Sequence, residues 1–338
     1  WSQFAELGLL ALPFSEADGG FGGGAVETMI VMESLGRALA VEPYLATVVL
    51  SGGVIRHAAN EAQRAEFVPQ IAGGEKIFAF AHHERAARYN LACVSTKATK
   101  DGDGYVLDGE KIYITSAEYA GVFVVWAVTN PDAPKGKGIS CFLVEAGTPG
   151  LIIGKAEKKL GQHGSATNPV IFDNCRIPAA NLMGRENDGF RVAVGELAGG
   201  RIGVAALSLG IARAAMDKAK AYVKERRQFG QALADFQGLQ WMIADRETDL
   251  EAARLLILNA AAKKDRREPF SKEASMAKLF ASEAAHRATD TAVQLFGGAG
   301  YIREYDVERH LRDARITRIY EGTSEVQRLI ISREALRQ

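Results

Sequence analysis

The chain has 338 residues, of which 47% are hydrophobic, and this is more apolar material than one compact core usually holds, so two or three domains are expected. Its 41 basic and 41 acidic residues cancel, which argues against broad electrostatic binding of nucleic acid or of an anionic membrane. The 3 cysteines, Cys93, Cys141 and Cys175, are too few and too widely spaced for a disulfide framework or a zinc site, and they fit a reducing, cytoplasmic compartment.

Residues 1–78 are predicted to form an N-terminal helical domain. Apolar residues recur at helical spacing over 27–39 and 44–59. The glycine-rich stretch at 19–24 lacks both the Gly-Lys-Ser/Thr of a phosphate loop and the spacing of a Rossmann motif. We therefore expect it to be an ordinary loop.

Residues 79–180 are predicted to form a small β domain. Asp101-Gly102-Asp103-Gly104 is typical of a turn between two strands. Residues 122–126 are β-branched and aromatic, which indicates a strand buried on both faces, and the apolar run around them is too short to cross a bilayer. Further strands are expected at 139–144, 151–153 and 170–172, and Pro178 marks the exit from the domain.

Residues 186–338 are predicted to be helical again. The expected helices span 201–226, 233–264, 271–295 and 323–337. Each has a broad apolar stripe, which predicts an antiparallel four-helix bundle. The order of helical, β and helical segments places the chain in the α+β multidomain class.

A carboxylate lies just before the last expected helix, within residues 319–328. Ser324 is the expected N-cap of that helix, and Gln327 would complete a capping box. Gly322 would let the chain turn sharply and carry Glu321 into an adjoining pocket. The pattern leaves a plain helix start and a catalytic carboxylate as alternatives.

Two further clusters could bind an anion. The paired arginines within residues 226–230 would ordinarily offset a helix dipole, but such a fork also grips phosphate. The glycines within residues 294–301 are ordinary after a helix, and they also let backbone N–H groups approach a pyrophosphate. Taken singly, both clusters leave both interpretations open.

Because these clusters occur together and in this order, the chain resembles the acyl-CoA dehydrogenases. The resemblance runs from end to end and is closest from Tyr105 onward. The motifs that carry the resemblance are Tyr320-Glu321-Gly322-Thr323-Ser324, Arg226-x-x-Phe229-Gly230 with Gln237, and Gln294-Leu295-Phe296-Gly297-Gly298. In this family, a helical domain, a β-barrel-like middle domain and a four-helix bundle hold FAD between the β domain and the bundle, and a neighbouring subunit completes the site. The resemblance implies the same fold, FAD as cofactor, and oxidation of an acyl-CoA thioester to a trans-2-enoyl-CoA.

The resemblance also assigns roles to residues of this chain. Glu321 matches the base that removes the α-proton, while the β-hydride passes to flavin N5. Burial in an apolar pocket would raise the pKa of its carboxyl and make it a stronger base. Substrate contacts are expected from Arg201, Tyr320 and Gly322. FAD contacts are expected from His82, His83, Tyr113, Thr115, Arg226, Phe229, Gln237, Gln294, Gly297, Gly298, Thr323 and Glu325.

The chain departs from the family at residues 83–90, where most members carry Thr-Glu-Pro-x-x-Gly-Ser-Asp. Glu84 is retained without the glycine and serine, and the loop resembles that of pimeloyl-CoA dehydrogenase small-subunit-like proteins. Flavin contact is expected through the backbone of His82 and His83, whose side chains point apart and do not suggest a metal site. An acid expected near CoA is replaced by Ala198. Relatives carry several tens of helical residues before the first residue of this chain, so we expect part of the acyl pocket wall to be missing.

The implied partners are an acyl-CoA substrate, an electron-transferring flavoprotein as electron acceptor, and further copies of the chain in a dimer or tetramer, or a related chain in a hetero-oligomer. Neither nucleic acid, nor a metal, nor a membrane span is expected. Two alternatives remain. One is a weakly active subunit of a mixed assembly, which the altered loop favours and Glu321 opposes. The other is a related flavoprotein oxidase or monooxygenase; monooxygenases of this fold typically lack the glutamate.

Overall fold

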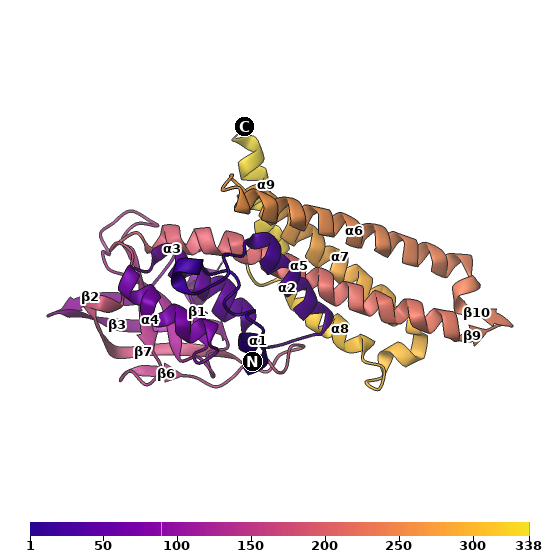
Figure 1. Cartoon of the computed structure of the whole chain (residues 1–338), viewed down its shortest axis with the longest axis horizontal. Coiled ribbons are helices and arrows are strands. Elements are labelled where there is room, and N and C mark those ends of the chain that lie inside the picture. The colour runs from indigo at the N-terminus through magenta and orange to yellow at the C-terminus, as the bar shows by residue number, and fades with distance from the viewer. Residues whose placement is uncertain (89, 338) are drawn as a thin grey trace. The chain divides into compact units, whose positions relative to one another are not determined.

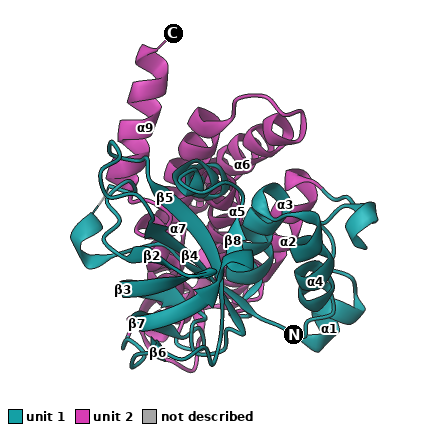
Figure 2. Cartoon of the chain, turned by 90° about the vertical axis from the view of Figure 1, so that its left-hand side faces the viewer, with its two compact units in different colours: residues 1–23, 42–158, 163–197 teal, residues 24–41, 159–162, 198–338 magenta. Residues whose placement is uncertain are grey.

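The computed structural model describes residues 1–88 and 90–337, so Tyr89 of the divergent loop and Gln338 lie outside the described residues. The described chain forms two compact units (Figure 2). The first contains residues 1–23, 42–158 and 163–197, and the second contains 24–41, 159–162 and 198–338. The predicted order of helical, β and helical segments is confirmed. The domain limits at 1–78, 79–180 and 186–338 stay a prediction.

Short helices open the first unit. They are α1 (Ser2–Glu6), a π-helix (Leu45–Ser51), α3 (Gly52–Ala58) and α4 (Glu61–Ala72). The π-helix runs directly into α3, which confirms the helix predicted over 44–59 and gives its first part a wider turn than expected. The predicted loop at 19–24 is also confirmed.

One mixed sheet forms the rest of the first unit. Its strands are β1 (Phe78–Ala81), β2 (Lys97–Asp101), β3 (Gly104–Thr115), β4 (Val122–Val128), β5 (Ile139–Glu145), β6 (Leu151–Ile153), β7 (Thr167–Pro178) and β8 (Leu182–Met183). The strand order is β6-β7-β3-β2-β4-β5-β8, and β1 pairs in parallel with β4. Asp101 pairs with Gly104 across the β2–β3 hairpin, which confirms the predicted turn.

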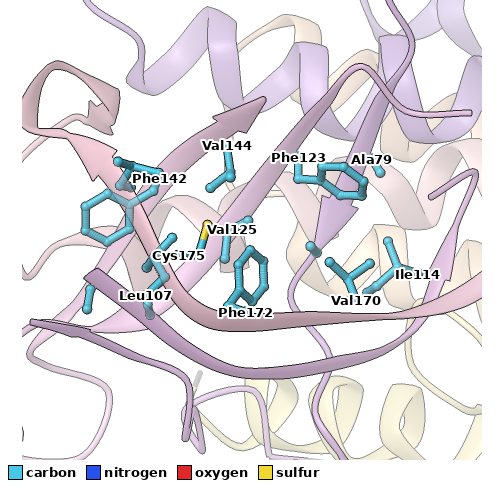
Figure 3. Close-up of a cluster of buried hydrophobic side chains, with 14 of the residues drawn as sticks. Ala79, Leu107, Ile114, Phe123, Val125, Phe142, Val144, Val170, Phe172 and Cys175 are labelled. Carbon is cyan, nitrogen blue, oxygen red and sulfur yellow. The ribbon is translucent and has the colours of Figure 1, made fainter. Parts of the chain in front are cut away.

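The core of this sheet is built from the inward side chains of its central strands (Figure 3). Phe123 and Val125 of β4 pack with Phe142 of β5 and with Val170 and Phe172 of β7. The predicted strand at 122–126 is buried throughout, so both of its faces are covered. This packed core fixes the positions of His82 and His83, which follow β1, and of Tyr113 and Thr115 in β3.

The second unit is a helical bundle. Its elements are α2 (Ala25–Arg37), α6 (Gln237–Asp265), α7 (Ser271–Phe296), α8 (Val307–Ala314), α9 (Ser324–Leu336) and the greater part of α5 (Gly189–Glu225), with a small hairpin of β9 (Arg227–Gln228) and β10 (Gln231–Ala232). The helix predicted from residue 201 therefore begins earlier, at Gly189.

The long helices of this bundle run antiparallel (Figure 1), and the ion pairs between them follow the same directions. Arg213 and Lys220 of α5 pair with Glu251 and Glu247 of α6, so residue numbers rise along one helix as they fall along the other. The pair formed by Lys263 of α6 and Glu273 of α7, near the end of one helix and the start of the next, repeats the reversal. The predicted antiparallel packing is confirmed.

Glycines allow α2 and α5 to pack at very short range. A Cβ on Gly36 would lie 2.2 Å from the carbonyl oxygen of Leu207, and a Cβ on Gly210 would lie 2.0 Å from that of Glu33. The most apolar window of α5 is long enough to span a bilayer, but 83% of it is buried inside the protein. Helix α5 is therefore a core helix.

Candidate active site

The turn before α9 has an unusual backbone. Glu321 has a φ of 54° and Gly322 has a φ of 92°, so two consecutive residues are left-handed. Glycine adopts this conformation freely, whereas a residue with a Cβ is strained by about 1 kcal/mol or more. Such strain persists only where neighbouring contacts hold it, and it is frequent at functional sites.

The N-cap of α9 is Thr323, not Ser324 as predicted. The Thr323 side chain accepts a hydrogen bond from the amide of Val326 at 3.3 Å. Ser324 instead donates its hydroxyl hydrogen to Glu283 Oε1 at 2.6 Å, because α7 places a carboxylate there. The predicted capping box is therefore wrong as well.

Gln327, assigned to that box, instead holds the preceding turn. Its Nε2 donates to the carbonyl oxygens of Glu321 and Gly322, at 3.1 and 2.9 Å. Lys278 of α7 donates to the Gly322 carbonyl as well, at 2.7 Å. Side chains from α7 and α9 thus fix the left-handed turn from two sides.

The Glu321 side chain is partly buried, and one of its carboxylate oxygens is closed off. Its Oε2 is buried and has no hydrogen-bond partner among residues 1–88 and 90–337. Burial raises its pKa from 4.5 to about 7, against the opposing pull of the Arg201 and Lys278 charges. A carboxylate with this pKa is ionised in useful amount at neutral pH and is a much stronger base than one in water.

The residues predicted to contact substrate lie in the same unit as Glu321. Arg201 of α5 is buried, and its Nε has no partner within the described part of the chain. The Tyr320 hydroxyl is also buried, and burial raises the pKa of the phenol, so it stays protonated. Unused polar groups beside a buried carboxylate are what a pocket for a polar substrate group requires.

Sequence reasoning missed Lys278. The lysine is fully buried in α7, on a face otherwise made of small residues such as Ala274, Ala277 and Ala281. Burial lowers its pKa to about 8. A single lysine within an alanine stripe was the signal available in the sequence, since a lysine is almost never fully buried without a partner.

In the first unit, Tyr113 lies in a bulge of β3. The pairing of β3 with β7 shifts between Lys111 and Ile114, and Tyr113 has a φ of 57°. The Tyr113 ring is 58% exposed and stacks on His83, with ring centroids 6.2 Å apart. Bulges re-aim side chains beside functional sites. Here the bulge presents an aromatic face to which a flat ligand could bind.

His82 and Thr115 border the same stretch of sheet. The His82 ring is buried against Trp126, at 5.3 Å between centroids, and its Nε2 has no partner among the described residues. Burial lowers the His82 pKa to about 3, so the ring is neutral. Thr115 ends β3, paired with Thr167.

Glu84, retained from the family motif, holds the sheet together. Its carboxylate accepts hydrogen bonds from Lys111 Nζ at 2.6 Å and from the Thr96 hydroxyl at 2.7 Å. The amides of Ser95 and Thr96 also donate to it. Lys111 also donates to the Trp126 carbonyl. This cluster anchors the start of the divergent loop, together with the residues just before β2, to β3 and β4.

The remaining predicted FAD residues lie in the second unit. Thr323 is half-buried, and the other seven are exposed. The exposed residues are Arg226, Phe229, Gln237, Gln294, Gly297, Gly298 and Glu325. Phe229 is 93% exposed at a left-handed position, and nothing lies within 4 Å of a Cβ built on Gly297 or Gly298. An exposed aromatic ring, an arginine and open glycine backbone suit a dinucleotide. In the first unit, the exposed Tyr113 ring suits a flat ligand, and the His82 nitrogen has no partner within residues 1–88 and 90–337. In each unit taken by itself, the residues present fit FAD.

Comparison with known proteins decides the family. The acyl-CoA dehydrogenase N-terminal, middle and C-terminal domain models match residues 1–75, 79–175 and 187–336. The chain belongs to the acyl-CoA dehydrogenase family. It is an FAD-dependent oxidoreductase that dehydrogenates an acyl-CoA thioester, as the resemblance implied.

Three relatives illustrate the similarity of this acyl-CoA dehydrogenase to known proteins. The human mitochondrial short-chain specific acyl-CoA dehydrogenase is 45% identical over 99% of this chain and 82% of its own. The structure of butyryl-CoA dehydrogenase from Megasphaera elsdenii is 41% identical, with a TM-score of 0.96 over 99% of this chain and 89% of that one. A chain from a structure described as the electron transferring flavoprotein of Acidaminococcus fermentans is also 41% identical, with a TM-score of 0.96 over 100% of this chain and 89% of that one.

Proposed function

We propose that Glu321 is the general base of this acyl-CoA dehydrogenase. The observation that carries the proposal is the buried Oε2 without a hydrogen-bond partner in the described chain, together with a pKa raised to about 7. A carboxylate whose function was structural would be expected to accept hydrogen bonds, as Glu84 does. Glu321 is therefore a base that is ready to take a proton.

The proposed reaction begins with removal of the α-proton by the Glu321 carboxylate. The left-handed turn aims this carboxylate, and its buried Oε2 is shielded from water. Arg201 and Lys278 favour the ionised base electrostatically without bonding to it within the described structure. FAD, when bound, supplies the acceptor for the β-hydride.

We assign the FAD contacts to two groups of residues. His82, His83, Tyr113 and Thr115 of the first unit form one group, in which the exposed Tyr113 ring suits a flat aromatic system. The second unit supplies Arg226, Phe229, Gln237, Gln294, Gly297, Gly298, Thr323 and Glu325. Their exposure supports contacts to FAD that is held by a second copy of the chain, so we propose a homo-oligomer, either a dimer or a tetramer.

Relatives support a substrate class and an electron acceptor. Because similar proteins are named short-chain specific and butyryl-CoA dehydrogenases, we propose a short-chain acyl-CoA as substrate, with contacts from Arg201, Tyr320 and Gly322. The similarity to a chain from work on an electron transferring flavoprotein supports such a protein as acceptor. We propose a cytoplasmic location, as for the reducing compartment inferred from the cysteines.

The test is Glu321→Gln, which keeps size and polarity and removes only the base. General-base contributions are typically ~100- to 10,000-fold, so anaerobic single-turnover flavin reduction by butyryl-CoA should fall by at least ~1,000-fold. FAD content and acyl-CoA binding should stay within a few-fold of the parent. Glu304→Gln, the same change at an exposed glutamate, is the matched control. Rapid flavin reduction by Glu321→Gln would remove Glu321 from the chemistry and favour the mixed-assembly alternative.

A further inference from the structure

Lys278 is a buried cation that has no carboxylate within ion-pairing distance in the described part of the chain. Removing an ammonium group from water costs several kcal/mol unless the protein compensates for it. The only bond that the described structure gives this ammonium is to the backbone carbonyl of Gly322, at 2.7 Å. The carboxylates that act on it do so from a greater distance, and Glu321 is the strongest of them, followed by Glu283 and Glu325.

The choice of partner matters for the chemistry of Glu321. A direct ion pair between Lys278 and the Glu321 carboxylate would strongly favour the ionised form and weaken it as a base. By bonding to the next carbonyl along the chain, Lys278 leaves Oε2 without a donor in the described structure, while its charge still acts on the carboxylate. The positive charge of Lys278 therefore stabilises the ionised Glu321 carboxylate without a hydrogen bond between the two side chains.

The same bond supports the strained backbone. Both hydrogen bonds to the Gly322 carbonyl come from side chains, Lys278 and Gln327, and they meet at the residue that follows the left-handed Glu321. Lys278 can therefore affect both the orientation of the Glu321 carboxylate, through the turn, and its pKa, through its charge.

We propose that Lys278 is a positioning residue for the reaction: its hydrogen bond to the Gly322 carbonyl holds the turn that aims Glu321, and its charge keeps the carboxylate ionised at neutral pH. The proposal rests on the assignment of Glu321 as the base. The other groups that act on this carboxylate are Arg201 of α5 and the adjacent Tyr320. Arg201 supplies a second positive charge, so Lys278 is expected to tune the site rather than to be indispensable.

The test compares three variants of the FAD-loaded enzyme by single-turnover flavin reduction with butyryl-CoA between pH 5.5 and 9. Lys278→Met removes the bond and the charge, Lys278→Gln removes the charge while keeping a donor, and Gln327→Leu removes the other donor without changing charge. Both Lys278 variants should shift the midpoint of the pH profile upward by about one unit, which is a ~5-fold loss at pH 7 for a carboxyl with a pKa of about 7. At high pH, Lys278→Gln should recover the parent rate, whereas Lys278→Met, which also lacks the bond to Gly322, should stay slower. Gln327→Leu should slow flavin reduction at every pH without moving the midpoint.

Several outcomes would overturn the proposal. An unshifted midpoint in Lys278→Gln, with FAD and acyl-CoA binding retained, would show that the lysine charge does not act on the base. A rate of Lys278→Met at high pH equal to that of Lys278→Gln would show that the bond to Gly322 does not hold the turn. If Lys278→Met fails to fold, Lys278→Gln alone decides the question about charge, and Gln327→Leu decides whether the turn depends on its side-chain donors. Failure of this proposal can be distinguished from failure of the proposed base, since Glu321→Gln would still abolish flavin reduction in the first case and would leave it intact in the second.

Discussion

Gln327 donates a hydrogen bond from its side-chain amide to the carbonyl oxygen of Gly322 at 2.9 Å, and a Cβ on Gly322 would lie 2.6 Å from that same amide nitrogen. The first turn of α9 is thus packed directly onto the turn that presents Glu321. A change at Gly322 must disturb the amide, the backbone or both.

Gly322→Ala should be destabilising and should slow the reaction. A left-handed φ of 92° and the displaced Gln327 amide should cost about 1–3 kcal/mol of unfolding free energy. Flavin reduction should fall by ~10-fold or more, because small misplacement of a catalytic group is costly. Denaturant unfolding and stopped-flow flavin reduction would measure the two effects.

Gly147→Ala is the matched control for that change. Gly147 has a φ of 83° with nothing within 4 Å of its Cβ position, so it carries the backbone strain without the clash. It should lose stability and keep its rate of flavin reduction. Equal rates in Gly322→Ala and Gly147→Ala would contradict the close coupling of the turn to the base.

Glu321→Gln should become more stable than the parent as pH rises. Burial raises the folded-state pKa of Glu321 from 4.5 to about 7, so the carboxyl favours folding below pH 4.5 and loses that contribution as pH rises through 7. Gln327 and Lys278 bonds to the backbone are unchanged by the substitution. The stability difference should therefore grow between these pH values and reach roughly 3 kcal/mol. Thermal unfolding at pH 5 and pH 8 would measure it, and a difference independent of pH would contradict the raised pKa.

Gly210→Ala should disrupt the packing of α2 on α5. Its Cβ would lie 2.0 Å from the Glu33 carbonyl oxygen, and backbone cannot move aside as a flexible side chain can. Overpacking of this kind costs about 1–3 kcal/mol. Gly195→Ala, in the same helix with nothing within 4 Å of its Cβ, should instead be neutral or gain about 0.5–1 kcal/mol. Equal stability of both variants in urea unfolding would contradict the close approach of the two helices.

Glu84→Gln should be strongly destabilising, because it leaves the fully buried Lys111 ammonium without a counter-charge. Removal of one partner of a buried ion pair costs about 3–5 kcal/mol. Joining Glu84→Gln with Lys111→Met should recover much of that loss, since no buried charge then remains unpaired. The readouts are unfolding free energy and FAD content, and a double variant no more stable than Glu84→Gln would show that the pair contributes by hydrogen bonding rather than by charge.

The divergent loop shows where prediction from local pattern was incomplete. The glycine and serine of the family motif are absent from this loop, but the retained Glu84 forms hydrogen bonds with Thr96 and Lys111 that no short motif predicts. Its partners are 12 and 27 residues away in sequence and meet only because the sheet brings β2 and β3 together. The resemblance of this loop to small-subunit-like proteins stays a prediction, as do the individual FAD contacts.

The sequence alone determined the order of helical, β and helical segments, the family, the cofactor and the position of a single acid before the last helix. These follow from periodicity and from short motifs, which are local properties of the chain. Only the tertiary structure decided that Thr323 rather than Ser324 caps α9 and that Lys278 bonds to the Gly322 carbonyl. It also decided that Glu321 is left-handed, with a buried oxygen that has no partner among the described residues. Hydrogen-bond partners, burial and the pKa shifts that burial causes depend on which helices meet. In this chain, the basicity of the Glu321 carboxylate depends on Lys278, which lies 43 positions earlier in the sequence, and on Arg201, which lies farther away still.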